Sequence, residues 1–78
     1  MNRRVMAARN LRMERHVLAA VGTGGTYAAV IGRVSNRLSP GEREATLARL
    51  EAGGAIRRDD NGTMTRDIQA WVNMRSQR

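Results

Sequence analysis

The chain has 78 residues, no cysteine and a formal net charge of +7. A chain of this length folds as one small domain with little room for a deep catalytic cleft. Without cysteine it has no disulfide, thiolate metal site or thiol nucleophile, and its single histidine, His16, has no second ligand or base spaced to join it. We therefore expect no enzymatic activity, no cofactor and no metal.

No segment approaches the roughly 18 apolar residues of a membrane-spanning helix. The protein is expected to be cytoplasmic, and nucleoid-associated if it binds DNA. All 14 basic residues are arginine, whose guanidinium group forks onto phosphate or guanine. The excess of positive charge indicates a polyanionic partner, although a coding bias toward arginine explains this composition equally well. The placement of the arginines has to decide between the two.

The first predicted helix covers residues 11–21, with Asn10 as its N-cap and Gly22 as its stop; an extension back toward Arg4 is the alternative. At helical spacing it has an apolar arc (Met13, Val17, Leu18 and Val21) and a basic arc (Arg9, Arg12, Arg15 and His16). A membrane-surface helix over residues 3–21 is the weaker alternative, because Asn10 and Glu14 interrupt the apolar arc. A second helix is predicted over residues 27–34, with Thr26 as N-cap and a buried stripe (Tyr27, Val30, Ile31 and Val34).

The third predicted helix, residues 40–52, has the clearest start. Ser39 is placed to cap it, Pro40 suits the first helical position, and Glu42 completes a capping box. Gly53 and Gly54 end the helix, because glycine accepts the left-handed conformation there.

After the glycine pair, "AIRR" and "TMTR" read as two strands, and Asn61-Gly62 between them indicates a hairpin, since both residues tolerate positive φ. A short fourth helix follows Asp67, its predicted cap. The predicted core gathers from all these segments (Leu18, Val21, Ile31, Val34, Leu47, Leu50, Ile56 and Trp71).

The order of these elements, and the stretch "LARLEAGGAIRRDDNG" above all, resembles the winged helix-turn-helix family. In that stretch a leucine lies near the end of the third helix, a glycine follows four residues later, and an isoleucine opens the strand before the wing turn. The resemblance covers residues 11–74. It implies a mainly α fold with a small β-hairpin: three helices, a two-stranded wing and a short C-terminal helix over residues 11–78, preceded by a basic N-terminal arm over residues 1–10.

In this family the third helix usually enters the major groove of DNA and the wing lies along the backbone or minor groove. The resemblance thus implies phosphate contacts from the wing and from the turn before the third helix (Arg57, Arg58, Arg66 and Arg37), and minor-groove contacts from the arm (Arg3 and Arg4). Further candidate DNA contacts lie on the third helix and the wing turn (Ser39, Arg43, Thr46, Arg49 and Asn61). The alternative is a wing that is merely solvated, in which the charges of Asp59 and Asp60 balance those of Arg57 and Arg58.

The third helix departs from the family pattern. Counting back from Leu50, the positions that usually face DNA are two carboxylates and two alanines (Glu42, Glu44, Ala45 and Ala48). Carboxylates repel phosphate, alanine offers no hydrogen bond to a base edge, and glutamate accepting from cytosine is a minor mode. Arg43 occupies a position that is normally half-buried.

Two functions remain open. The first is a small basic DNA-binding protein, a transcriptional regulator that holds double-stranded DNA by wing and arm arginines on phosphates. The second is a protein-interaction module that regulates or inhibits a protein target by docking, for example transcription machinery or a host defence complex. Fold alone does not choose between them. We expect a monomer, with a homodimer through Trp71 or Met74 as the alternative.

Overall fold

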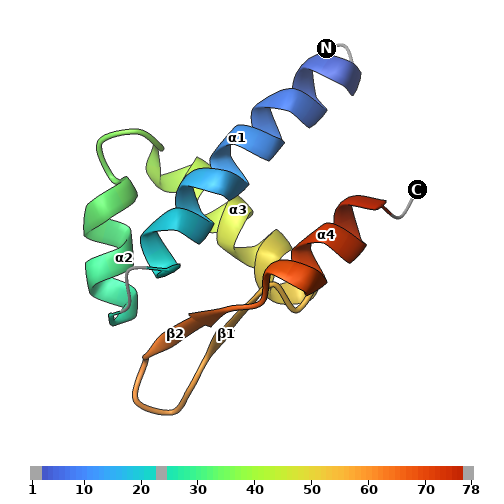
Figure 1. Cartoon of the computed structure of the whole chain (residues 1–78). Helices are drawn as coiled ribbons and strands as arrows, with labels where there is room; N and C mark the ends of the chain where they lie inside the picture. The colour runs from blue at the N-terminus through green and yellow to red at the C-terminus, as the bar shows by residue number, and fades with distance from the viewer. Residues whose placement is uncertain (1–2, 23–24, 77–78) are drawn as a thin grey trace.

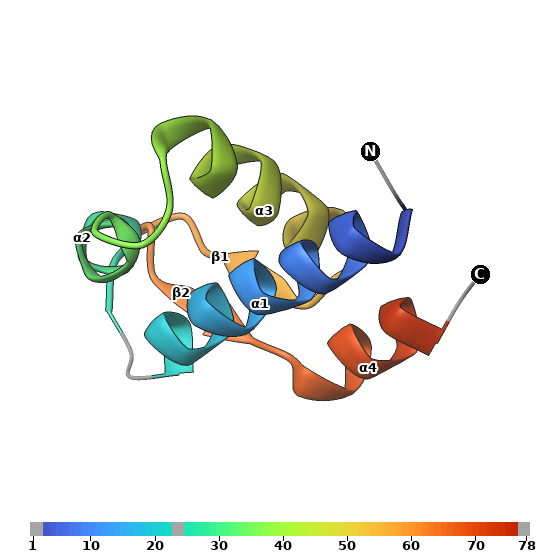
Figure 2. The same cartoon turned by 90° about the horizontal axis from the view of Figure 1, so that it is seen from above.

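The computed structural model describes residues 3–22 and 25–76. These residues form a mainly α structure with one two-stranded antiparallel hairpin. The elements in chain order are α1 (Arg3–Gly22), α2 (Tyr27–Val34), α3 (Pro40–Ala52), β1 (Ile56–Arg58), β2 (Met64–Arg66) and α4 (Ile68–Ser76). The long helix α1 runs through the molecule with α3 on one side of it and α4 on the other (Figure 2). The hairpin projects from the end opposite to the start of α1 (Figure 1).

Helix α1 is longer than residues 11–21 and includes the extension toward Arg4. It begins at Arg3, so the residues expected to form a basic arm are helical from there on, and Asn10 lies inside the helix instead of capping it. The physical reason is that "RRVMAAR" contains strong helix formers and neither glycine nor proline, so the helix continues past the potential cap. Its other end is at Gly22, as predicted.

The predicted caps of α2, α3 and α4 are confirmed. The Thr26 hydroxyl accepts from the Ala29 backbone N–H at 3.3 Å, and the Asp67 carboxylate accepts from the Ala70 N–H at 3.0 Å. Both bonds of the capping box between Ser39 and Glu42 are present. These caps satisfy N–H groups that have no partner within their own helices.

The C-terminus of α3 is closed by the glycine pair. The Gly54 N–H donates to the carbonyl of Glu51 at 3.1 Å, and the Ala55 N–H donates to that of Leu50 at 2.9 Å. This pair of bonds is a Schellman motif. Gly54 has a φ of 78°, which explains why glycine is needed at this position.

The hairpin turn differs in detail from the expected one. Gly62 has a positive φ of 79°, whereas Asn61 does not use the left-handed region. The turn is closed by the Gly62 N–H, which donates to the Asp59 carbonyl at 3.0 Å. The Asp59 carboxylate also accepts from the backbone N–H groups of Asn61 and Thr63, at 2.9 and 2.8 Å. Asp59 thus organises the turn.

The hairpin is bonded to the start of α2. Thr26 and Thr63 form an antiparallel bridge, the Tyr27 N–H donates to Gly62, and the Met64 N–H donates to Gly25. Gly25 and Thr26, just before α2, therefore lie beside β2 as a short additional edge. These bonds fix the position of the hairpin relative to the helices.

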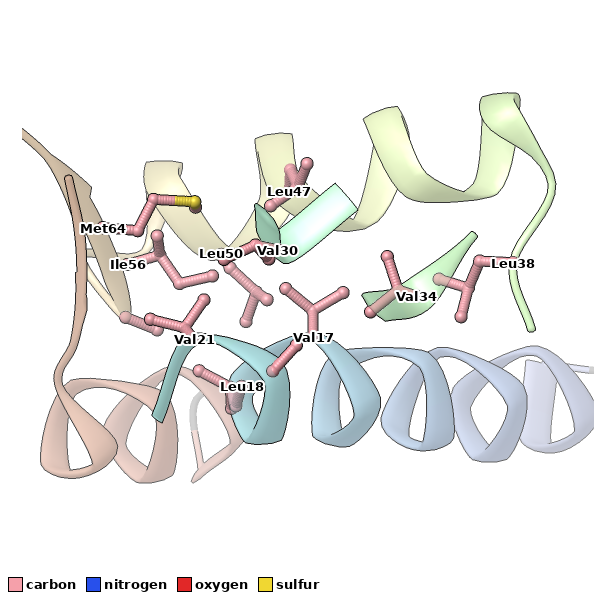
Figure 3. Close-up of a cluster of buried hydrophobic side chains, with 12 residues drawn as sticks. Val17, Leu18, Val21, Val30, Val34, Leu38, Leu47, Leu50, Ile56 and Met64 are labelled. Atoms are coloured by element: carbon pink, nitrogen blue, oxygen red, sulfur yellow. The ribbon is translucent and has the colours of Figure 1, made fainter. Parts of the chain in front are cut away.

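The core is a single cluster to which α1, α2, α3 and both strands contribute (Figure 3). Six of the eight predicted core residues are buried (Leu18, Val21, Val34, Leu47, Leu50 and Ile56). The other two, Ile31 and Trp71, are half-buried against the cluster. Trp71 lies on α4, which has no fully buried residue, so this helix covers the edge of the core and is not inserted into it.

Candidate nucleic-acid interface

The register of the hairpin divides its three arginines between two faces. Ile56 pairs with Arg66, and Arg58 pairs with Met64. Because cross-strand partners share a face, Arg58 and Arg66 lie on the side of the hairpin that carries the buried Ile56 and Met64. Arg57, which pairs with Thr65, lies on the outer side.

Arg58 and Arg66 both have partners within the protein. The Arg58 Nε lies 3.2 Å from the Glu51 carboxylate of α3, and its guanidinium carbon lies 4.7 Å from the centre of the Tyr27 ring. The Arg66 Nη1 donates to the Leu18 carbonyl of α1 at 3.2 Å. The two predicted phosphate contacts thus attach the hairpin to the helices, and Arg57 is the hairpin arginine directed to solvent.

Two candidate residues on α3 face inward. Thr46 is 0% exposed, and its hydroxyl accepts from the Arg49 Nη2 at 3.1 Å. The Arg49 Nε lies 3.3 Å from the carboxylate of Glu14, which is 2% exposed. Thr46 is therefore not available to a partner at the surface, and Arg49 is engaged with the interior.

Glu14 is the residue that sequence reasoning missed. Its carboxylate also accepts from the Trp71 indole Nε1 at 2.9 Å and from the Arg75 Nη1 at 3.4 Å. It therefore joins α1, α3 and α4. The available signal was a lone carboxylate within the apolar arc of a basic helix.

Three of the six remaining candidates lie around the start of α3. The Ser39 side chain is committed to the capping box. Arg43 is half-buried, as expected for its position, and donates to the Leu38 carbonyl at 3.2 Å. Arg37 is exposed in the turn between α2 and α3.

The other candidates lie at the two ends of the molecule. Asn61 is exposed at the hairpin tip, where its backbone N–H is bonded to Asp59. Arg4 lies in the first turn of α1, at the end away from the hairpin (Figure 1), and the Arg3 side chain lies outside the described part. A 20-residue helix is about 30 Å long, so the N-terminal arginines and the hairpin do not form one site.

The outward face of α3 carries little positive charge. Its exposed residues include Gly41, Glu44, Ala45 and Ala48, while Glu42 is half-buried and paired with Arg9. Beside this face, a hollow of about 210 Å³ lies between α2, α3 and the hairpin, with Glu44, Glu51 and Arg58 on its walls. Two carboxylates against one guanidinium make this hollow unfavourable for phosphate.

The described arginines without a partner lie outside that hollow. Among the residues that the structure describes, the side chains of Arg12, Arg15, Arg37 and Arg57 are exposed and have no hydrogen-bond or ion-pair partner. Arg37 precedes α3 and Arg57 follows it. Arg12 and Arg15 lie on the outer surface of α1.

No family model, curated protein or solved structure matches this chain. Within residues 3–22 and 25–76, no helix is both long enough and apolar enough to cross a membrane.

Proposed function

We propose that the chain is a winged-helix protein that binds double-stranded DNA mainly through phosphate contacts at the two ends of α3. Support for the fold comes from the order of three helices and a hairpin. The hydrogen bonds between the hairpin and the start of α2 also support this fold, because they hold the hairpin against the helices in the way a wing is held. Support for the function comes from where the described arginines without a partner lie.

The observation that carries the proposal is the placement of Arg37 and Arg57. Arg37 lies in the turn before α3, and Arg57 lies on the outer side of the strand that follows it. Helix α3 has 13 residues and is therefore about 20 Å long. A major groove is about 12 Å wide, and we infer that the two cations, one before and one after this helix in the chain, reach phosphates on the two sides of the groove.

Base recognition by α3 is not part of the proposal. Gly41, Ala45 and Ala48 offer no side-chain hydrogen bond to a base edge, and Glu44 repels phosphate. Phosphate contacts position a protein on DNA without reading its sequence. A transcriptional regulator built in this way would take its site preference from DNA shape and deformability.

A protein-docking function is the second candidate, and the hollow beside α3 favours it. Glu44 and Glu51 flank this hollow, and Arg58 is already paired with Glu51 there. A protein partner tolerates such a mixed surface better than a polyanion does. Docking would then use the surface that DNA-binding winged-helix proteins use for the groove.

Titration of a random-sequence duplex of about 20 base pairs at several salt concentrations tests the DNA function. We expect affinity to fall with salt, with a slope of about −0.9 for each phosphate neutralised. Arg37→Ala and Arg57→Ala should each make the slope shallower by about 0.9 and weaken all sequences alike. Arg58→Ala is the matched control from the same hairpin, because Arg58 is already paired and its loss should leave the slope unchanged.

The absence of binding at about 50 mM salt, with the protein folded by circular dichroism, would overturn the DNA function. Recovery of one protein in a pull-down from host extract, lost on Glu44→Arg, would then favour docking.

A further inference from the structure

A second basic surface lies on the side of the molecule formed by α1 and the turn before α3. A groove of about 370 Å³ lies there, with Arg9, Arg12 and His16 of α1 on one wall. Arg37 lines it from the turn, and Glu42 lines it from α3. Of these, only Arg37 was expected to contact a ligand.

Helix α1 forms one wall of this groove. Residues three, four and seven positions apart share a face of a helix, so Arg9, Arg12 and His16 lie together. The opposite wall is held in place by Leu38, which is 2% exposed in the core. The backbone N–H groups of Arg37 and Leu38 both donate to the Val34 carbonyl at 3.0 Å. Arg37 is therefore attached to an ordered turn.

The charges in the groove do not balance. The Glu42 carboxylate is paired with Arg9 and also accepts from the Ser39 backbone N–H at 2.9 Å. Arg12 and Arg37 have no such partner among the described residues. Guanidinium groups that face one hollow repel each other until an anion enters, and their forked N–H groups match the oxygens of a phosphate.

We propose that Arg12, His16 and Arg37 bind a phosphate group in this groove. The inference rests on the proposed function, because the phosphate is taken to come from the backbone of bound DNA. Arg37 lies both at the start of α3 and at the edge of the groove, so a duplex bound along α3 would continue onto the side of α1 that carries Arg12 and His16. A free phosphorylated ligand has the same chemistry, and the experiment separates the two sources.

The first arm uses inorganic pyrophosphate as the probe and follows the His16 ring signals by NMR. We expect saturable shifts, and an affinity about tenfold weaker in Arg12→Ala, since one charge-assisted contact is lost. Arg15→Ala is the matched control, because Arg15 is an exposed arginine on the same helix but does not line the groove. Glu42→Gln should strengthen binding, because it removes the only carboxylate among the described residues of the groove and releases Arg9.

The second arm repeats the duplex titration with the same variants. Arg12→Ala should make the salt slope shallower by about 0.9, and Arg15→Ala should leave it closer to that of the wild type. A defect of Arg12→Ala in both arms supports a groove that takes backbone phosphate. A defect with pyrophosphate, in a protein that binds no duplex, supports the phosphate site but assigns it to a free ligand and removes the DNA function.

Equal behaviour of Arg12→Ala and Arg15→Ala in both arms would overturn the groove site. If Arg57→Ala still weakened duplex binding in that case, the proposed function would stand without it. Helicity by circular dichroism checks that the variants are folded.

Discussion

The indole Nε1 of Trp71 donates a 2.9 Å hydrogen bond to the carboxylate of Glu14, which lies 57 positions earlier in the chain. The same carboxylate is 2% exposed and lies within 3.3 Å of Arg49 and 3.4 Å of Arg75. Helix α4 has no fully buried residue, so this interaction is a principal attachment of α4 to the rest of the protein.

Glu14→Ala should destabilise the protein by about 3 kcal/mol. This value is at the lower end of the range for breaking a buried ion pair, because the side chains of Arg49 and Arg75 both reach solvent. Glu14→Gln should cost less, since an amide oxygen still accepts from Trp71. Urea denaturation measures both. Glu44→Ala, on the exposed face of α3, is the control and should change stability by less than about 0.5 kcal/mol. Equal effects of Glu14→Ala and Glu44→Ala would contradict a structural role for the buried carboxylate.

Ser39→Ala should destabilise the protein by about 0.5–2 kcal/mol, because the Glu42 N–H at the start of α3 loses its acceptor. Ser39→Asp should keep most of the stability, since aspartate is an equally good N-cap. Thermal denaturation of the two variants beside the wild type measures the difference. If Ser39→Ala melted at the wild-type temperature, the capping box would have no energetic role.

Protonation of Glu42 should weaken the fold at low pH. Its pKa is lowered from 4.5, first by the hydrogen bond from the Ser39 backbone N–H and then by the Arg9 guanidinium. A carboxyl group whose pKa is depressed in the folded state adds stability above its unfolded pKa, and this contribution is lost as the pH falls through the folded value.

The wild type should therefore be more stable than Glu42→Gln at pH 7, and the difference should shrink below pH 4.5. Denaturation at a series of pH values measures it. Glu44→Gln is the control, because the Glu44 side chain has no partner among the described residues. A difference between wild type and Glu42→Gln that did not change with pH would show that the ionised carboxylate is not what stabilises the start of α3.

Two glycines should respond to alanine in opposite directions. Gly54 has a φ of 78° with open space around it, so Gly54→Ala should cost about 1–2 kcal/mol through backbone strain alone. Gly32 lies inside α2, also with nothing near it, so Gly32→Ala should add about 0.5–1 kcal/mol. Chemical denaturation of both variants tests the pair, and a shift in the same direction would contradict the assigned conformation of one of them.

Local features could be predicted from the sequence because their bonds join residues close together in the chain. The capping box at Ser39 links residues three positions apart, and the bonds that close α3 at Gly54 and Ala55 are equally short in sequence. The bounds of α2 and α3, the hairpin and the cap of α4 follow from such signals. Asn10 was misjudged because a potential cap does not end a run of strong helix formers.

The use of each arginine was decided by the tertiary structure. Arg57 and Arg58 are neighbouring residues with the same charge. Strand alternation nevertheless turns Arg57 outward and places Arg58 against Glu51 and Tyr27. Likewise, only packing shows that Glu14 is buried or that Arg12 and Arg37 share a groove. A side chain's partners across the fold depend on how helices and strands are placed, and no local pattern encodes that placement. Composition therefore determined that this protein is strongly basic, whereas the fold decided which of its charges remain for a partner.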